Sequence, residues 1–250
     1  MRNSLIASAA ALAAAGGIAA PAFADAVSYE VQEQSFEGYF AGAEDAKGLV
    51  LVVHDWDGVG DYERQRADML AEMGYDAFVL DMFGEGTPVE TVEDRRAATG
   101  ALYGDRERMR ALIAAGLEQA RAQSGAEGLV VTGYCFGGAV ALEMARSAEL
   151  SDEAAGYATF HGGLSTPEGQ SWPEGVPPIL VMHGGADSSV TLEDVTTLAQ
   201  ELEQAGASYT VEIYSNAPHG FTVFGDDRYQ ERADAESWEA FTDFLAEQFG

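Results

Sequence analysis

The chain alternates short, continuous apolar runs with longer segments of helical composition. The first run covers residues 48–53, and runs over 76–80, 128–132 and 155–160 follow it. An uninterrupted apolar run is typical of a strand that is covered on both faces, as in a parallel sheet. Strands that alternate with helices therefore predict an α/β fold, with a mostly parallel central sheet and helices on both faces.

The remaining segments extend this pattern to the end of the chain. Two more strands are expected over 179–182 and 209–214, and residues 27–31 and 35–40 are expected to add antiparallel edge strands. Helices are expected over 60–73, 92–123 with a break near 100–104, 136–146, 192–204 and 234–249. A loop rich in glycine and proline covers 162–178. Because no repeat or linker interrupts residues 25–250, we expect a single domain.

The first 24 residues have the features of an export signal. Arg2 supplies a positive start, and the apolar run over 5–20 is too short for a stable membrane anchor. Ala22-Phe23-Ala24 then offers a cleavage site with small residues at both required positions. We expect residues 1–24 to be removed as a signal peptide and the mature protein, beginning at Asp25, to reach the periplasm free of the membrane. The alternative is an uncleaved apolar helix.

Acidic residues dominate the charge of the chain. Asp and Glu number 42 against 13 Lys and Arg, which gives a net charge of −29 at pH 7. Proteins bind nucleic acids and anionic membranes through clustered Lys and Arg, so both are excluded as partners. We interpret the excess charge as a solvated surface that keeps the protein soluble, and we expect a monomer or a small homo-oligomer.

The strand over 128–132 ends in the sequence Gly-Tyr-Cys-Phe-Gly-Gly, and a helix follows at once. A nucleophile flanked by glycines between a strand and a helix predicts the sharp turn that exposes a catalytic side chain, here Cys135. The helix N-terminus is expected to lower the pKa of this thiol. Cys135 is the only cysteine, so it forms no internal disulfide. The alternative is a cysteine packed in the core.

Two later strand ends carry the partners that such a nucleophile needs. Asp187 follows the strand over 179–182 in a glycine-rich turn, and His219 follows the strand over 209–214 between Pro218 and Gly220. Nucleophile, acid and base in this chain order are typical of α/β-hydrolases. The prediction is a triad of Cys135, Asp187 and His219, with Asp194 as an alternative acid that fits less well because it lies inside a helix.

The strand over 48–53 ends in His-Asp-Trp-Asp-Gly. We expect the backbone amides of Trp56 and Phe136 to form an oxyanion hole, and Asp55 to face the nucleophile. His54, His161 and His183 also end strands, and we expect them to pack under the site with hydrogen bonds to the backbone. Because no metal-ligand spacing accompanies Asp55 and Asp57, we predict no metal and no cofactor.

Taken together, these motifs resemble the dienelactone hydrolase family of α/β-hydrolases, over nearly all of residues 25–250. The resemblance implies a Cys-His-Asp triad that hydrolyses an ester or lactone through an acyl-thiol intermediate. It also implies that an acidic residue, commonly Glu, helps to ionise the thiol. Here that residue is Asp55, whose side chain is one methylene shorter than that of Glu, and the resemblance implies that it activates the thiol.

The resulting expectation is a hydrolase of a small-molecule carboxylic ester or lactone. Phe83, Tyr134 and Phe221, with Trp56 and Phe136, are expected to line the site. Family members that act on the anionic dienelactone hold its carboxylate with two arginines, and the matching positions here are Glu85 and Val223. This predicts a preference for neutral substrates unless Arg95, Arg96 or Arg228 takes over that task. A thioesterase and a non-catalytic exported binding protein are the alternatives.

Overall fold

Continuous apolar runs form the middle of one eight-stranded sheet. The computed structural model describes residues 23–250. Every residue is buried in β3 (Leu49–Val53), β4 (Asp76–Leu80), β5 (Leu129–Tyr134), β6 (Gly156–Phe160) and β7 (Ile179–Gly184). β8 (Tyr209–Tyr214) forms one edge and is only partly buried. Full burial on both faces is the environment that the apolar runs predict, so the α/β prediction is confirmed.

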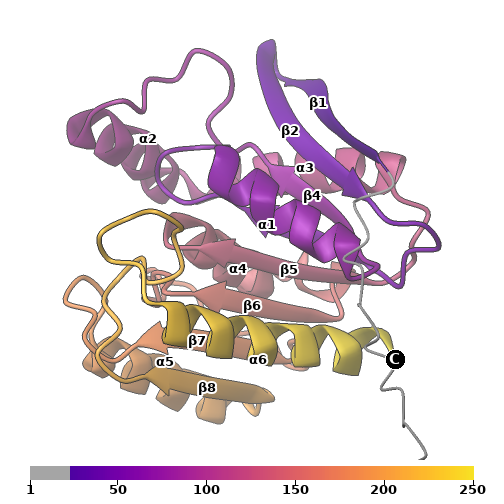
Figure 1. The fold of residues 1–250 in the computed structure, drawn as a ribbon. Helices are drawn as coiled ribbons and strands as arrows, with labels where there is room; N and C mark the ends of the chain where they lie inside the picture. Colours follow the sequence, from indigo (N-terminus) through magenta and orange to yellow (C-terminus); the bar gives the residue numbers. More distant parts are fainter. Residues whose placement is uncertain (1–22) are drawn as a thin grey trace, which may run out of the picture.

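The strands follow the order β1-β2-β4-β3-β5-β6-β7-β8 (Figure 1). β1 (Phe23–Val31) and β2 (Gln34–Gly42) are antiparallel to their neighbours, as expected for the first two strands. All pairs from β4 to β8 are parallel. The carboxyl ends of these six strands therefore share one edge of the sheet, where sheets of this kind bind their ligands.

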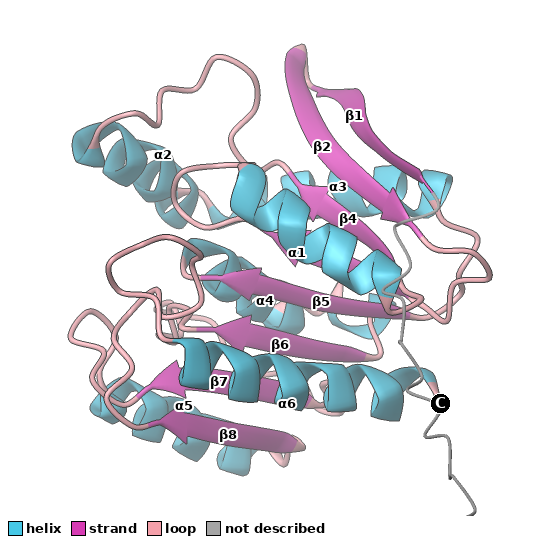
Figure 2. Ribbon diagram, viewed as in Figure 1, coloured by secondary structure: helices cyan, strands magenta, loops and turns pink. Residues whose placement is uncertain are grey.

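Helices cover both faces of the sheet (Figure 2). α1 (Asp61–Glu72) and α6 (Glu231–Phe249) lie on one face. α3 (Arg106–Gln123), α4 (Phe136–Arg146) and α5 (Leu192–Ala205) lie on the other. α2 (Val92–Gly104) lies toward the edge formed by the carboxyl ends, and a short 3₁₀ helix covers Ser151–Glu153. None of the helices in 23–250 is long and apolar enough to cross a membrane.

The expected break in the long helical segment is confirmed at Asp105. This residue ends α2, and its side chain accepts a hydrogen bond of 2.9 Å from the amide of Arg108 in the first turn of α3. Aspartate is a preferred N-cap because its carboxylate satisfies an amide that the helix leaves unpaired. Asp105 thus ends α2 and begins α3 as a separate helix.

β1 begins at Phe23, four residues before its expected start and ahead of the expected cleavage point. The Phe23 ring packs 5.5 Å from the Phe40 ring, and Phe23 pairs with Gly42. Cleavage after Ala24 would remove two of the nine pairs between β1 and β2 and leave the pairs from Asp25 onward. Residues 1–22 of the expected signal peptide lie outside the described residues.

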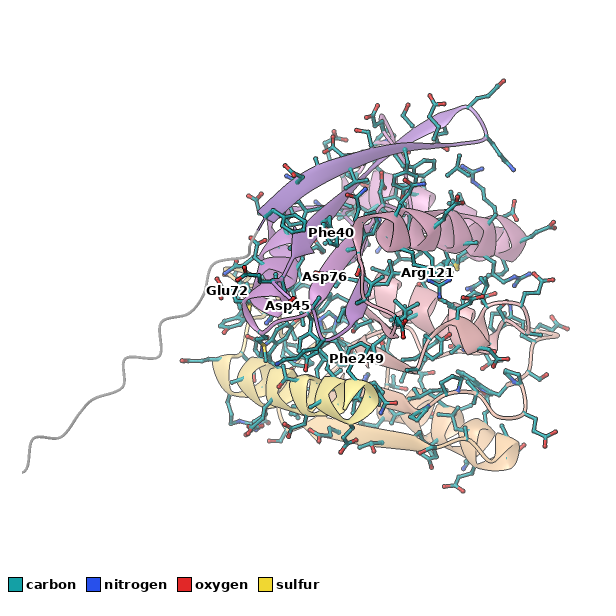
Figure 3. The ribbon with its side chains drawn as sticks, turned by 90° about the vertical axis from the view of Figure 1, so that its right-hand side faces the viewer. Phe40, Asp45, Glu72, Asp76, Arg121 and Phe249 are labelled. Carbon is teal, nitrogen blue, oxygen red and sulfur yellow. The ribbon has the colours of Figure 1, made fainter. Side chains whose placement is uncertain are left out.

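The C-terminal end of α6 lies at the edge of the sheet opposite to the carboxyl ends of β4 to β8, and Figure 3 labels Phe249 there. Phe249, near the end of α6, packs its ring against Gly48 and Gly128, at the amino ends of β3 and β5. Closer to its start, Asp234 of α6 forms a buried ion pair with Arg66 of α1. A buried pair that lost one partner would leave an uncompensated charge, so this contact holds α6 in register with α1.

Candidate active site

Cys135 occupies the sharp turn that the glycine pattern predicts. Its backbone has φ 51° and ψ −109°, a region that non-glycine residues rarely adopt and that turns the chain from β5 into α4. A Cβ on Gly133 would lie 2.2 Å from the carbonyl carbon of Gly137, and a Cβ on Gly137 would lie 2.1 Å from the carbonyl oxygen of Val53. Only glycine fits at both places, and the turn places the thiol at the carboxyl edge of the sheet.

The structure brings the three predicted triad residues together. His219 Nδ1 lies 2.8 Å from Asp187 Oδ2, and His219 Nε2 lies 3.1 Å from Cys135 Sγ. The other carboxylate oxygen of Asp187 accepts amides from Ser189 at 2.8 Å and Val190 at 2.9 Å. The carboxylate is thus held from two sides, and its free oxygen is directed at the imidazole. This is the geometry of an acid, a base and a nucleophile.

Asp194, the alternative acid, has a different task. Its side chain accepts hydrogen bonds from the amide and hydroxyl of Thr191, which caps α5. Asp194 is half-buried and is not among the hydrogen-bond partners of His219 in residues 23–250. Of the two candidates, the structure therefore joins only Asp187 to the imidazole.

The two ends of the triad ionise differently. Burial opposes the ionisation of Asp187, but hydrogen bonds from His219 and the Val190 amide outweigh it and lower the pKa of this carboxyl. Burial raises the pKa of the Cys135 thiol to about 12, and the nearby Asp55 adds to this effect, while the Phe136 amide opposes it. The expectation of a lowered thiol pKa is therefore wrong, because loss of hydration outweighs the helix N-terminus. Cys135 rests as a neutral thiol at one end of the triad, and Asp187 is ionised at the other end.

Asp55 lies beside the thiol, but it is a poor base. Burial raises the pKa of its carboxyl to about 9, and the neighbouring carboxylates of Asp57 and Glu63 contribute. At pH 7 the group is therefore protonated. Among the described residues no hydrogen bond joins it to Cys135. The suggested route in which this carboxylate ionises the thiol thus lacks support in the resting protein.

Asp55, Asp57 and Glu63 bring carboxylate oxygens within 4.8 Å of one another, so they are the described residues most suited to hold a cation. Two of the three already accept backbone amides. Glu63 accepts those of Gly60 at 3.0 Å and Asp55 at 3.4 Å, and Asp55 accepts that of Asp57 at 3.1 Å. These bonds explain the cluster as a brace between the loop after β3 and the start of α1.

A cavity of about 350 Å³ opens above the triad. Trp56 and Phe136, the residues expected to supply oxyanion amides, both line it. Trp56 comes from the loop after β3, and Phe136 is the first residue of α4, where amides have no partner within the helix. Asp55, Cys135 and His219 complete the part of the wall that the sequence predicts.

The expectation that Phe83, Tyr134 and Phe221 line this cavity is wrong. Tyr134 is 1% exposed and stacks on Phe160, with ring centroids 4.7 Å apart. Phe221 is fully buried, and Phe83 packs against the ring of Phe136 and faces a neighbouring hollow.

Several lining residues come from segments that carry no motif. Tyr103 and Arg96 lie on α2, Gly163 lies in the loop after β6, and Ser189 and Val190 follow Asp187. Of these residues, the sequence indicated only Arg96, as an alternative clamp for an anionic substrate, and the structure places it in the cavity wall. Arg228 also lines the cavity, and it packs over Gly220 and forms two bonds of 2.8 Å to Asp226.

The three other histidines are buried, as expected. His54 bonds the Asp55 carbonyl and accepts the Met82 amide, and His183 bonds the Val190 carbonyl at 3.1 Å. For both residues the prediction of backbone partners is confirmed. It is wrong for His161, whose Nε2 lies 2.8 Å from the hydroxyl of Thr222 and whose ring lines the cavity.

Comparison with known proteins gives a consistent result. The profile of the Dienelactone hydrolase family matches residues 36–249. The crystal structure of a dienelactone hydrolase-like promiscuous phosphotriesterase from metagenomic libraries is 29% identical with a TM-score of 0.81, and the structure m3DLH is 30% identical with a TM-score of 0.79. Each alignment covers 91% of this chain and 99% of the other.

A carboxymethylenebutenolidase of Rhodococcus opacus is 25% identical over 206 residues, which are 78% of this chain and 79% of the relative. The family profile spans most of the sheet and all the strand ends that build the cavity. The chain therefore belongs to the dienelactone hydrolase family and is a hydrolase of lactones or esters.

Proposed function

We propose that the protein hydrolyses carboxylic esters or lactones through an acyl-thiol intermediate on Cys135. The observation that carries this proposal is the continuous path from Asp187 through His219 to the Cys135 thiol, with 2.8 Å and 3.1 Å between the bonded atoms. This path ends in a cavity large enough for a small ester. Ping-pong acyl transfer needs only these parts and a water molecule.

The first half of the reaction transfers the acyl group. As the substrate binds, His219 Nε2 takes the Cys135 proton while the sulfur attacks the ester carbonyl carbon. The amides of Trp56 and Phe136 receive the oxygen that gains negative charge, and His219 then gives its proton to the departing alcohol. Because the resting thiol is neutral, this proton transfer accompanies the attack. Asp187 favours it by stabilising the imidazolium.

The second half regenerates the thiol. A water molecule loses its proton to His219 and attacks the acyl-thiol carbon. The intermediate collapses with release of the acid, and Cys135 sulfur recovers the proton from His219. An acyl-thiol forms equally from an oxygen ester, a lactone or a thioester, so thioester hydrolysis is a second candidate on the same machinery.

We further propose that neutral substrates are preferred. Glu85 and Val223, which match the positions of the family's carboxylate-binding arginines, do not line the cavity. The charge of Arg228 is already balanced by Asp226. Arg95 is held outside the cavity wall by the Val89 carbonyl at 2.6 Å and by the Trp56 ring. Arg96, exposed on α2, remains as the cation most accessible to an anionic substrate.

The test is a panel of p-nitrophenyl esters, lactones and thioesters, assayed at low salt. We expect kcat/KM for a neutral ester to exceed that for a matched carboxylate-bearing lactone by about tenfold or more, since a missing charge-assisted bond costs roughly 1.5–3 kcal/mol. A ratio of neutral to anionic kcat/KM below one would contradict the preference for neutral substrates. In that case, a higher ratio in Arg96→Gln would identify Arg96 as the group that binds the substrate carboxylate. No turnover of any panel member would favour the non-catalytic binding protein.

We also propose that the mature protein is exported and begins at Asp25. The expected cleavage leaves the pairs from Asp25 to Val31 available to hold β1 on the sheet. Mass spectrometry of the protein from the periplasm of its native host should give the mass of residues 25–250. A chain of full length recovered from the cytoplasm would contradict this proposal.

A further inference from the structure

His161 lies where β6 ends, one strand away from the nucleophile. Its side chain is almost fully buried, yet it forms part of the cavity wall. The backbone has φ 40°, and its amide donates a 2.9 Å hydrogen bond to the carbonyl of Met182 on β7. Residues other than glycine adopt such a conformation at an energetic cost, and this cost is retained mostly at functional sites. The conformation brings the imidazole of His161 beside the triad.

The His161 ring is in direct contact with the ring of the proposed base. The centroids of the His161 and His219 rings lie 5.1 Å apart with planes at 63°. The His161 ring also contacts the Phe221 ring, with centroids 5.4 Å apart and planes at 75°. Edge-to-face contacts of this kind restrict the rotation of both rings. His219 needs such a restraint, because it lies in a loop and its side chain is 17% exposed.

The His161 ring is itself anchored from below. Its Nε2 bonds the Thr222 hydroxyl at 2.8 Å, and that hydroxyl bonds Tyr62 Oη at 2.7 Å. Arg66 donates to the carbonyl of Thr222 at 3.0 Å and forms the buried ion pair with Asp234. Thr222 lies three residues after His219. The network therefore ties the His219 loop, β6, α1 and α6 to one point.

We propose that His161 is a positioning residue, which holds the His219 imidazole in line between Asp187 and Cys135 and is held in turn by Thr222. This inference rests on the proposed role of His219 as the base. The titratable and charged groups around His161 include His219, Asp187, Arg228 and Tyr134, whose ring lies 6.1 Å away, and burial together with His219 lowers the pKa of His161. His161 therefore stays neutral, and it places no second charge beside the imidazolium that forms on His219.

The test compares two variants with a matched control. His161→Asn removes the ring but keeps a residue type that tolerates positive φ. Thr222→Val removes the hydroxyl that anchors the ring. Thr159→Val is the control, because Thr159 is equally buried and its hydroxyl has no partner among the described residues. For each protein, kcat and KM are measured with a neutral ester. The imidazole N–H that His219 donates to Asp187 is observed by NMR of protein labelled with ¹⁵N-histidine.

We expect His161→Asn to lower kcat by roughly 10- to 100-fold with KM within about threefold of the parent, since a small misplacement of a catalytic group has effects of this size. Thr222→Val should lower kcat by a smaller factor. In both, the His219 N–H signal should broaden or disappear as the ring becomes mobile. Thr159→Val should keep the parent kcat and signal. Unfolding temperatures confirm that each variant is folded.

A kcat within about twofold of the parent in both variants would overturn the proposal, because positioning losses are larger than this. A loss of kcat with an unchanged His219 signal would also overturn it, as would equal losses in Thr159→Val. If the parent protein hydrolyses no ester, the proposed function fails. The NMR signal then still decides whether His161 positions His219.

Discussion

Replacement of Cys135 by alanine is expected to lower kcat for ester hydrolysis by about 10⁴-fold or more, as removal of a triad nucleophile does in other enzymes. Alanine keeps the Cβ and the strained turn between Gly133 and Gly137, so the change removes the sulfur and little else. The oxyanion amides and the imidazole stay in place. The residual activity of Cys135→Ala therefore measures the rate at which the oxyanion amides and His219 promote direct attack of water on the ester.

Two further measurements make this result specific. Acid-quenched parent protein, taken during turnover of an activated ester, should carry one acyl group by intact mass, and Cys135→Ala should carry none. Because the chain has a single cysteine, one equivalent of iodoacetamide should label it and abolish turnover, although slowly, since the thiol is neutral at rest. Hydrolysis at the parent rate by a folded Cys135→Ala protein would rule out the acyl-thiol mechanism.

Asp187→Asn is expected to lower kcat by about 10⁴-fold, and His219→Ala should have an effect of the same order. An asparagine at 187 can donate its amide N–H to His219 Nδ1, which favours the tautomer with the proton on Nε2. Nε2 then has no lone pair with which to take the proton of Cys135. His219 then donates toward the sulfur instead of accepting its proton. The positions of the three side chains are expected to be kept, but proton transfer from Cys135 to His219 is expected to be lost.

The chain offers a matched control in Asp194→Asn. Both aspartates follow β7 and both accept backbone amides, but Asp194 completes the capping box that Thr191 begins at the start of α5, and it is not among the hydrogen-bond partners of His219. We expect Asp194→Asn to keep the parent kcat and to lower the stability of the fold by at most about 1 kcal/mol, the usual size of a capping effect. Equal losses of kcat in the two variants would contradict the assignment of Asp187 as the orienting acid.

The parts of the fold that the sequence predicts best are those in which local and long-range preferences agree. The apolar runs of β3 to β7 need burial on both faces, and a parallel sheet covered by helices is the arrangement that supplies it. The glycine-flanked Cys135 and the strand ends at Asp187 and His219 follow from this topology, because parallel strands deliver their carboxyl ends to one edge. Three residues far apart in the sequence could thus be assigned to one site.

The wall of the cavity could not be predicted in the same way. Tyr103 and Arg96 reach it because α2 leaves the sheet and extends toward the carboxyl edge, and the direction of a helix after a loop is set by tertiary packing. Phe221 and Tyr134 lie within two residues of His219 and Cys135 in sequence but point into the core. A residue that is close in sequence to a catalytic motif therefore has its backbone near the site, but its side chain can point into the core.

The ionisation of the thiol also depends on information that the sequence does not contain. A helix N-terminus and a paired imidazole both favour a thiolate, and these features are visible in the pattern of residues. Burial and the carboxyl of Asp55 act in the opposite direction, and their strength depends on how tightly α4, β3 and the loop after β3 close around the sulfur. Only the assembled site decides which effect is larger.

The neutral state of Cys135 has a consequence for the durability of the protein. Peroxides and disulfides react with thiolates, and burial raises the pKa of this thiol so far that little of it is ionised at pH 7. The chain has no second cysteine that could trap a sulfenic acid as a disulfide and so return it to the thiol. Oxidation of this one sulfur would therefore proceed toward irreversible products. In the proposed mechanism the proton leaves the sulfur only as the sulfur attacks a bound substrate, so the neutral thiol would be protected from this damage between turnovers.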